Sequence, residues 1–365
     1  MNNVSQEKEV KKSSHILYFD VLNILAAFSV IWIHFGNEIH WYDGSTVWKM
    51  CVPIHVLTFW AVPVFFMLTG ATLLGYRQKY DTVTFFKRRL LRGVAPYFIW
   101  GTIFIVIYRN TLFEGVSGTK NILNTLLSIY IDKKMEPIYW FFLPLVAIYL
   151  SVPVFSLLAK PENKAVLLYA VGMGILTISI LPTGYNLFQL VFFPEQQYTW
   201  NGMWNMSALG GYSLYAVMGY WASTYEFTKK QRLLCYSGGI LGALIRGLGL
   251  WFLSARDQVV PGVLMDYMCF PALFLALAIF VAMRYLNLDA VYNYPVLVKA
   301  ITELSKCSLG VYLIHILVMR FMQTLPWIER YSVKWYYLYP LPTYMFCVAI
   351  VFAARKIPVI KKLFP

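Results

Sequence analysis

Ten apolar stretches, each long enough to cross a lipid bilayer, constrain the fold of this chain more than any other feature. A membrane-spanning helix needs roughly 20 predominantly apolar residues. The chain is 59% hydrophobic and 13% charged, whereas soluble domains carry about 25% charged residues. We therefore predict an all-α polytopic membrane protein with about ten transmembrane helices, and we exclude most soluble enzymes and nucleic-acid-binding proteins. The stretches lie at about 16–36, 53–75, 90–109, 138–158, 165–183, 207–224, 233–254, 261–283, 302–322 and 336–354.

The placement of lysine and arginine predicts the orientation in the membrane. The net charge is +14, and the N-terminal segment and every second connection after it carry most of the 31 basic residues. Cytoplasmic loops are enriched in lysine and arginine, so both termini are expected in the cytoplasm. The predicted order is a cytoplasmic segment at 1–15, a transmembrane domain at 16–356 and a cytoplasmic tail at 357–365. No cleavage site follows the first apolar run, which predicts a retained span.

The five cysteines predict neither a disulfide framework nor a metal site. They are scattered, mostly inside apolar runs, with no C-x-x-C pair, and no histidine or cysteine stands at metal-ligand spacing. They are Cys51, Cys235, Cys269, Cys307 and Cys347.

Polar side chains inside a predicted span are functional candidates because they are costly there. The first span contains Asp20, Asn23 and His34. His34 lies eleven residues after Asn23, about 16 Å along a helix at 1.5 Å per residue, and so in the outer half of the membrane. In soluble proteins a lone histidine is more often a core residue. In a membrane its imidazole, with an ordinary pKa near 6.5, is suited to act as a general base.

Other spans carry further polar candidates. Arg246 and Asp266 are expected at similar depth on adjacent antiparallel helices, which favours a structural ion pair over a catalytic role. His55 is close to the outer end of its span, where contact with water explains it as well as catalysis does. His315 is at mid-depth without a role of its own. The glycine-rich run beginning at Gly238 predicts close helix packing.

A basic cluster precedes the third span. Arg89 and Arg92 are three residues apart, next to Arg88. Such a cluster is commonly a topology anchor at the inner membrane edge. Two arginines on one helix face also provide a multi-donor fork for phosphate groups.

The outer connections 110–137 and 184–206 are longer than a turn requires. The second is aromatic and includes Trp200, Asn201 and Trp204. An interfacial aromatic belt explains it simply, and a lid that stacks on sugar rings is the alternative.

Six segments in order resemble the membrane acyltransferase-3 family nearly end to end. The resemblance implies a ten-helix enzyme of the bacterial cell membrane. Such an enzyme moves an acyl group, commonly acetyl or succinyl, from cytoplasmic acyl-CoA to hydroxyls of an extracytoplasmic sugar or polysaccharide. The segments are FDVLNILAAFSVIWIHF, AVPVFFMLTGATLL, FFKRRLLRGVAPYFIW, IYWFFLPLVAIYLSVPVF, GGYSLYAVMGYWA and LSKCSLGVYLIHILVM.

The resemblance also assigns roles. The family places an arginine eleven residues before the histidine of the first span; here His34 matches, but Asn23 stands at the arginine position. Arg89 and Arg92, with Arg88 beside them, match the motif that holds the CoA phosphates. The predicted site therefore has His34 and Asn23 as catalytic residues and no metal. The predicted acceptor-binding residues are Trp140, Trp200, Asn201, Trp204 and His315.

Two alternatives remain open. A transporter or flippase for glycan intermediates also fits ten helices with a few buried charges, although the internal repeats typical of transporters are not found. The second alternative is an inactive acyltransferase-like protein, because Asn23 is uncharged where the family has an arginine. The expected partners are acyl-CoA, a glycan and the lipid bilayer, but not nucleic acid. The acyl group, the acceptor and the oligomeric state stay undetermined.

Overall fold

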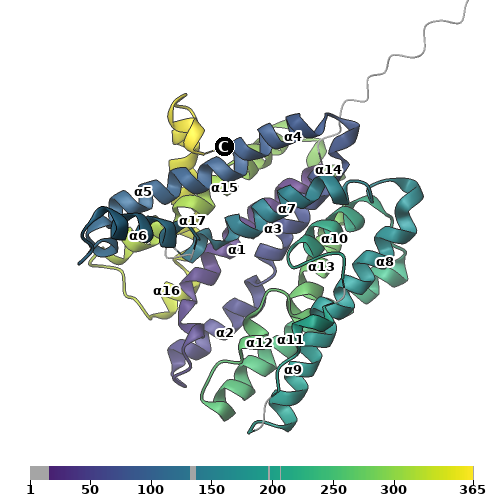
Figure 1. The fold of residues 1–365 in the computed structure, drawn as a ribbon, viewed down its shortest axis with the longest axis horizontal. Coiled ribbons are helices and arrows are strands. Elements are labelled where there is room, and N and C mark those ends of the chain that lie inside the picture. The colour runs from purple at the N-terminus through teal and green to yellow at the C-terminus, as the bar shows by residue number, and fades with distance from the viewer. Residues whose placement is uncertain (1–15, 132–136, 196–197, 206, 365) are drawn as a thin grey trace, which may run out of the picture.

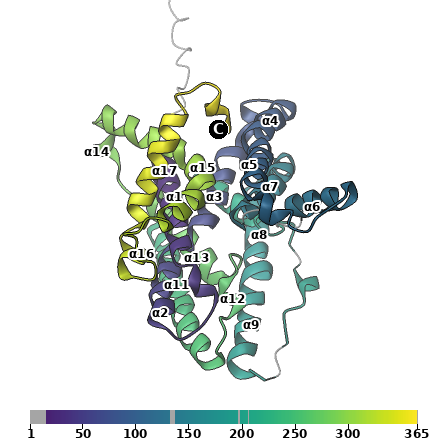
Figure 2. The same ribbon diagram turned by 90° about the vertical axis from the view of Figure 1, so that its left-hand side faces the viewer.

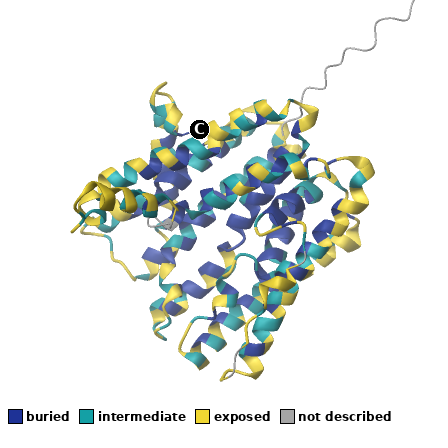
Figure 3. Ribbon diagram, in the orientation of Figure 1, coloured by how far each residue is buried: buried dark blue, intermediate teal, exposed yellow. Residues whose placement is uncertain are grey.

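The computed structural model describes residues 16–131, 137–195, 198–205 and 207–364, and this part of the chain is helical without any strand (Figure 1). The predicted all-α fold is confirmed. Buried residues gather in the centre of the helical bundle, and exposed ones cover its periphery (Figure 3). The predicted N-terminal segment 1–15 lies outside the described residues.

Eight helical segments in the described chain are long and apolar enough to cross a membrane. They are α1 (Leu17–Phe35), α2–α3 (Thr46–Thr58 and Ala61–Leu73), α4–α5 (Thr82–Arg89 and Ala95–Leu112), α7 (Phe142–Phe155), α8–α9 (Lys164–Gly174 and Leu181–Phe192), α11 (Lys229–Asp257), α12–α13 (Gly262–Met265 and Phe270–Arg284) and α15 (Pro295–Gln323). The two other predicted stretches form the shorter helices α10 (Ser213–Thr224) and α17 (Pro340–Ala354). The connecting helices are η1 (Asn37–His40), α6 (Thr119–Ile131), α14 (Asp289–Tyr292) and α16 (Val333–Tyr337).

Helices α1 and α15 run parallel and in register. The Nδ2 atom of Asn23 donates hydrogen bonds to the carbonyl and hydroxyl oxygens of Ser305, both at 3.0 Å. Eleven residues further along α1, His34 lies beside His315, which is ten residues further along α15. If only the eight long segments crossed the membrane, α15 would be the eighth and would run opposite to α1. One more crossing must lie between them, and α10 supplies it.

Helix α17 returns the chain to the face where α1 begins. A Cβ atom added to Gly310 of α15 would lie 2.5 Å from Val351 of α17, and Arg355 donates to the carbonyl of Lys306 at 3.0 Å. Residue numbers rise along one helix as they fall along the other, so α15 and α17 are antiparallel. The two ends of the described chain therefore lie on the same face of the bundle (Figure 1), which we call the terminal face.

Glycine lets α3 and α10 approach closely. A Cβ atom added to Gly70 would lie 1.7 Å from the carbonyl oxygen of Ala216, and one added to Gly219 would lie 1.9 Å from that of Met67. No larger residue fits without separating the helices, as in other small-residue helix contacts.

Helices α11 and α13 also pack through glycine, as the sequence predicts. A Cβ atom on Gly239 would lie 2.4 Å from Ala278, and one on Gly242 would lie 2.7 Å from the carbonyl of Pro271. Gly238 contributes little, because its nearest neighbour is Phe274 at 3.8 Å.

The two predicted outer connections contain helices. Residues 119–131 form α6, and α9 continues to Phe192 instead of ending near 183. Proline normally ends a helix because it lacks a backbone N–H group, which is why the sequence suggests an end at Pro182. Here a wide turn with π-helical hydrogen bonding, Ile175–Ile180, precedes Pro182, and the helix continues beyond it.

Candidate functional site

The four described histidines form two neighbouring pairs, which lie beyond the half of the bundle that is nearer the terminal face. The rings of His34 and His315 are 5.1 Å apart, and those of His40 and His55 are 5.9 Å apart. Partial burial, and then the positive charge of Arg246, lower the pKa of His40. No three His, Cys, Asp or Glu side chains in the described chain are placed as metal ligands. His40 has no signal in the sequence, because it lies in the short η1 segment outside the apolar runs.

Backbone carbonyls fix the proton positions on the two buried histidines. The Nδ1 atom of His315 lies 2.6 Å from the carbonyl oxygen of Tyr312, and the Nε2 atom of His55 lies 3.1 Å from that of Gly36. A carbonyl oxygen only accepts, so these nitrogens carry the hydrogen. The opposite nitrogens, Nε2 of His315 and Nδ1 of His55, are buried without a hydrogen-bond partner among the described residues. Each is a lone pair able to accept a proton.

Arg246 is fully buried, and its charge is not paired with a carboxylate in the described structure. Its guanidinium carbon lies 3.4 Å from the ring centroid of Phe59, and Nη2 makes a long contact to Met265 sulfur at 3.7 Å. The Nε and Nη1 atoms have no hydrogen-bond partner in the described chain. A buried unpaired charge is costly and is generally kept for a function.

The predicted ion pair between Arg246 and Asp266 does not form within the described residues. Asp266 is exposed, and its Oδ1 atom accepts from the backbone N–H of Met268 at 2.8 Å. The reason is local: α12 ends at Met265, so Asp266 lies in the turn before α13 and not on a helix facing α11.

A column of stacked aromatic rings extends from Arg246. Phe59 stacks on Tyr267 with centroids 4.1 Å apart and ring planes 10° apart. Tyr267 stacks on Trp140 at 5.6 Å, and Trp140 contacts Tyr212 at 5.6 Å. Trp140 is therefore packed inside the bundle near the histidines. Tyr267 has no distinguishing signal in the sequence, because it is one of several aromatic residues near the start of its apolar run.

Trp200, Asn201 and Trp204 lie elsewhere, on the segment after α9. Asn201 and Trp204 are exposed, and the backbone N–H of Trp200 donates to the side chain of Asn186 at 2.9 Å. None of the described hydrogen bonds or ring contacts joins these three residues to the histidines. Of the predicted acceptor-binding residues, His315 lies beside His34 and Trp140 lies in the aromatic column, and the other three lie apart on the segment after α9.

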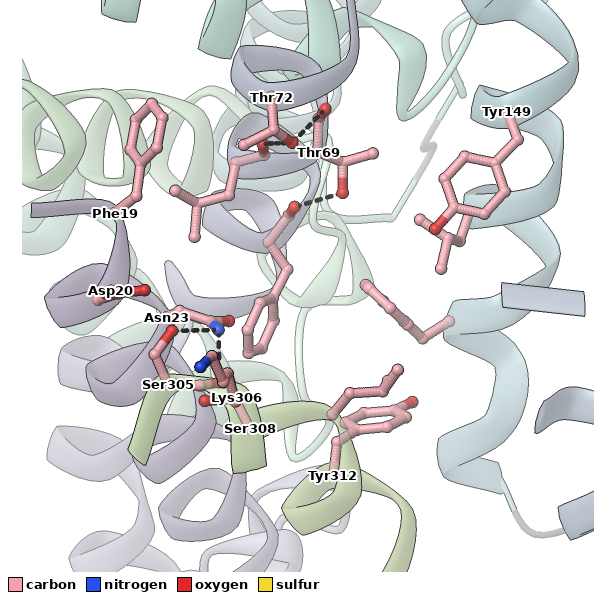
Figure 4. Close-up of a pocket in the computed structure, with 15 residues that line it drawn as sticks. Phe19, Asp20, Asn23, Thr69, Thr72, Tyr149, Ser305, Lys306, Ser308 and Tyr312 are labelled. Atoms are coloured by element: carbon pink, nitrogen blue, oxygen red, sulfur yellow. Dashed lines mark hydrogen bonds between the residues drawn. The ribbon is translucent and has the colours of Figure 1, made fainter. Parts of the chain in front are cut away.

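A cavity of about 380 Å³ opens among α1, α3, α7 and α15, towards the terminal face. Asn23 and Ser305 form one wall, and Tyr149 faces them from α7 (Figure 4). On α15 the lining runs from Ser305 to Tyr312, about 10 Å at 1.5 Å per residue. His315 is one helical turn beyond Tyr312, so the cavity leads towards the paired histidines. Further polar lining comes from Thr69, Thr72 and Ser308.

The three predicted phosphate-binding arginines are placed differently. Arg89 interacts with Tyr149 in the wall of this cavity, and its Nε atom is buried without a hydrogen-bond partner in the described structure. Arg88 is exposed and lies over the ring of Tyr80 at 4.5 Å. Arg92 is exposed and follows in a π-helical turn, Leu90–Val94. That wide turn changes the spacing of an ordinary helix, so Arg89 and Arg92 are not simply one turn apart on one α-helical face.

Comparison with known proteins gives one match. The acyltransferase-3 family model, described as an acyltransferase domain, matches residues 16–354. No curated protein and no solved structure matches the chain.

Proposed function

The chain belongs to the acyltransferase-3 family and is a membrane acyltransferase, and on this basis we propose that it transfers an acetyl or succinyl group from cytoplasmic acyl-CoA to a sugar hydroxyl across the membrane. The observation that carries this proposal is the cavity that opens towards the terminal face and ends one helical turn from the His34–His315 pair. It would let a donor and an acceptor approach the same histidines from opposite sides.

The donor enters from the terminal face, which the proposal places in the cytoplasm. Arg89 and Arg92 bind the CoA phosphates, because guanidinium groups hold phosphates through several charge-assisted hydrogen bonds. The chain of the donor that carries the thioester occupies the cavity between α1 and α15. Hydroxyl and amide groups on the cavity walls can form hydrogen bonds with the amide groups of this part of the donor.

His34 acts as the general base. It takes the proton of the acceptor hydroxyl as the oxygen attacks the thioester carbonyl carbon. The carbon–sulfur bond then breaks, the acyl group stays on the acceptor oxygen as an ester, and the CoA thiolate takes the proton from the imidazolium. His315, with its unpartnered Nε2 atom 3 residues beyond the cavity, orients His34 or the acceptor hydroxyl.

Arg246 stabilises the negative charge that develops on the carbonyl oxygen. A preorganised donor in a site without water contributes strongly to a transition state and needs no rearrangement. Its two unpartnered nitrogens and its charge near His40 and His55 support this role.

An inactive acyltransferase-like protein is the alternative that Asn23 favours. However, Lys306 also lines the cavity, next to the Ser305 that Asn23 binds. Its ammonium nitrogen lies 2.8 Å from a carboxylate oxygen of Glu303, so the cavity keeps a cation at that wall in the form of an ion pair.

An assay of purified protein in lipid nanodiscs, supplied with acetyl-CoA or succinyl-CoA, distinguishes an active enzyme from an inactive acyltransferase-like protein. The proposal predicts that the chain as it stands binds the donor and slowly releases free CoA, with water taking the acyl group in place of the acceptor hydroxyl. Release only after Asn23→Arg would establish the inactive form, and no binding of either donor by any variant would reject the acyltransferase mechanism altogether.

A further inference from the structure

We infer that a second cavity, between α9 and the α11–α12 turn, binds the acceptor sugar, and that this sugar is uncharged or carries an amino group. The inference rests on the proposed function and adds the acceptor's place and chemical class. The cavity has a volume of about 460 Å³. Helices α9 and α12 lie side by side in both ribbon views, away from the terminal face (Figures 1 and 2).

The lining of this second cavity suits a sugar. Asparagine and glutamine both donate and accept, threonine hydroxyls do the same, and carboxylates accept from paired sugar hydroxyls. By contrast, the large groove beside α2, α11 and α13 is lined almost entirely by aliphatic and aromatic side chains and faces outward from the bundle, as expected of a lipid contact. The polar lining of the second cavity is Thr183, Asn186, Gln189, Thr199, Asp257 and Asp266.

The charges of the lining favour a sugar without a negative charge. Asp257 is neutralised by Arg256, whose Nε and Nη2 atoms lie 2.6 and 2.9 Å from its two carboxylate oxygens. Arg256 also donates to the carbonyl of Leu190, which joins the end of α11 to α9. Asp266 has no such cation among the residues that the structure describes, and one of its oxygens accepts from the backbone N–H of Met268. One uncompensated carboxylate therefore faces the ligand, and it repels uronic acids and sugar phosphates.

The aromatic segment after α9 forms the rim of this second cavity. Tyr198 lines it and is 68% exposed. The side chain of Asn186 in the cavity accepts from the backbone N–H of Trp200, and the Trp200 ring lies edge-on to Tyr185 at 5.9 Å. Exposed aromatic faces beside amide groups bind the apolar faces of sugars. If this segment stacks on sugar rings, as the sequence allows, it does so at the rim of the second cavity.

A buried cluster of side chains connects the lining of this second cavity with residues next to His34 and Arg246. Cys269 lines the cavity on one side. On its other side it packs in a buried cluster with Ile33 and Phe59. Ile33 precedes His34 in the chain, and Phe59 lies under Arg246. An acceptor held here lies next to the segment that carries His34, away from the donor cavity, and its hydroxyl reaches the imidazole when the side chains of this cluster move apart.

Binding and transfer are measured separately with three defined oligosaccharides of equal length. They are the tetramer of N-acetylglucosamine, which is neutral, the tetramer of glucosamine, which is cationic, and tetragalacturonate, which is anionic. Quenching of tryptophan fluorescence reports binding, and acylated sugar is detected by mass spectrometry.

The inference predicts that the neutral or the cationic tetramer binds and that tetragalacturonate does not. Asn186→Leu should weaken the binding of the sugar at least 10-fold. Asp266→Asn should weaken the binding of the cationic tetramer more than that of the neutral one. Asp289→Asn, on an exposed short helix at the terminal face, is the matched control and should change nothing.

Preferential binding of tetragalacturonate would overturn the inference, and so would binding of every tetramer that is insensitive to Asn186→Leu. Sugar binding that depends on Asn186, without any acyl transfer, would reject the proposed function and leave the sugar site standing. Absence of binding by all three tetramers, in protein that still releases CoA, would reject the sugar site alone.

Discussion

The imidazole rings of His34 and His315 lie 5.1 Å apart on two helices that run parallel and in register. The hydrogen bonds from Asn23 to Ser305 hold the same two helices together eleven residues earlier. One rigid helix pair therefore lines the donor cavity near the terminal face and carries both histidines at its far end. Positions on such elements are held more accurately than positions on loops.

The first prediction concerns His315. His315→Gln should lower kcat for acyl transfer by about 10²-fold, in the range known for positioned acid–base groups. The reason is that the variant removes the basic imidazole nitrogen next to His34. The KM for acyl-CoA should not change, since His315 lies beyond the cavity. His40→Gln, in the segment after α1, is the comparison and should retain most activity. A rise in KM with an unchanged kcat would assign His315 to donor binding.

The second prediction concerns Arg246. Arg246→Met should raise the melting temperature, because replacing a buried charge by an apolar side chain often stabilises a protein by about 1–4 kcal/mol. The same variant should lose acyl transfer, whereas Arg246→Lys should keep part of it. Thermal unfolding in detergent and a transfer assay measure both. A less stable but active Arg246→Met protein would show that the arginine has a structural role.

The third prediction separates two adjacent arginines. Arg89→Gln should raise the Kd for acyl-CoA about 10-fold, because Arg89 interacts with Tyr149 in the wall of the donor cavity and has a buried Nε atom without a partner in the described structure. Arg88→Gln should have a smaller effect, because Arg88 is exposed and lies over Tyr80. Titration at two salt concentrations tests this, and the difference should shrink at high salt. Equal effects would indicate an unspecific positive surface.

The fourth prediction concerns the contact between α3 and α10. Gly70→Leu should reduce the yield of folded protein severely, since even a Cβ atom would lie 1.7 Å from the carbonyl oxygen of Ala216. Gly172→Ala is the control: nothing lies within 4 Å of its added Cβ atom, and alanine should stabilise α8 by about 0.5–1 kcal/mol. Size-exclusion profiles after heating compare them. A folded Gly70→Leu protein would mean that the two helices can separate without cost.

Apolar composition predicts most of this fold, and the reason is physical. Backbone groups in lipid must satisfy their hydrogen bonds within a helix, so each long apolar run has one available structure. The interrupted helices are harder to predict. The continuation of α9 beyond Pro182 depends on a wide turn upstream, which no residue type specifies.

The candidate site is less predictable, because it depends on contacts between distant segments. His34 can be identified from the sequence, because a polar side chain inside an apolar span is energetically unfavourable and therefore points to a function. Similar expected depth in the membrane also predicts an ion pair between Arg246 and Asp266. This prediction is wrong because α12 ends at Met265, which sequence spacing does not show. The stacking of Phe59 on Tyr267 joins residues far apart in the chain, and neither aromatic residue is unusual in its own span.

The most direct test of the mechanism is a single-turnover measurement with protein in nanodiscs, labelled acetyl-CoA or succinyl-CoA and the acceptor tetramer that binds. The account predicts that His34→Ala binds the donor with unchanged Kd and transfers no label to sugar, while the unmodified protein transfers it within one turnover. Transfer by His34→Ala at the unmodified rate would contradict the account, because the proton of the acceptor hydroxyl would then be taken by another group.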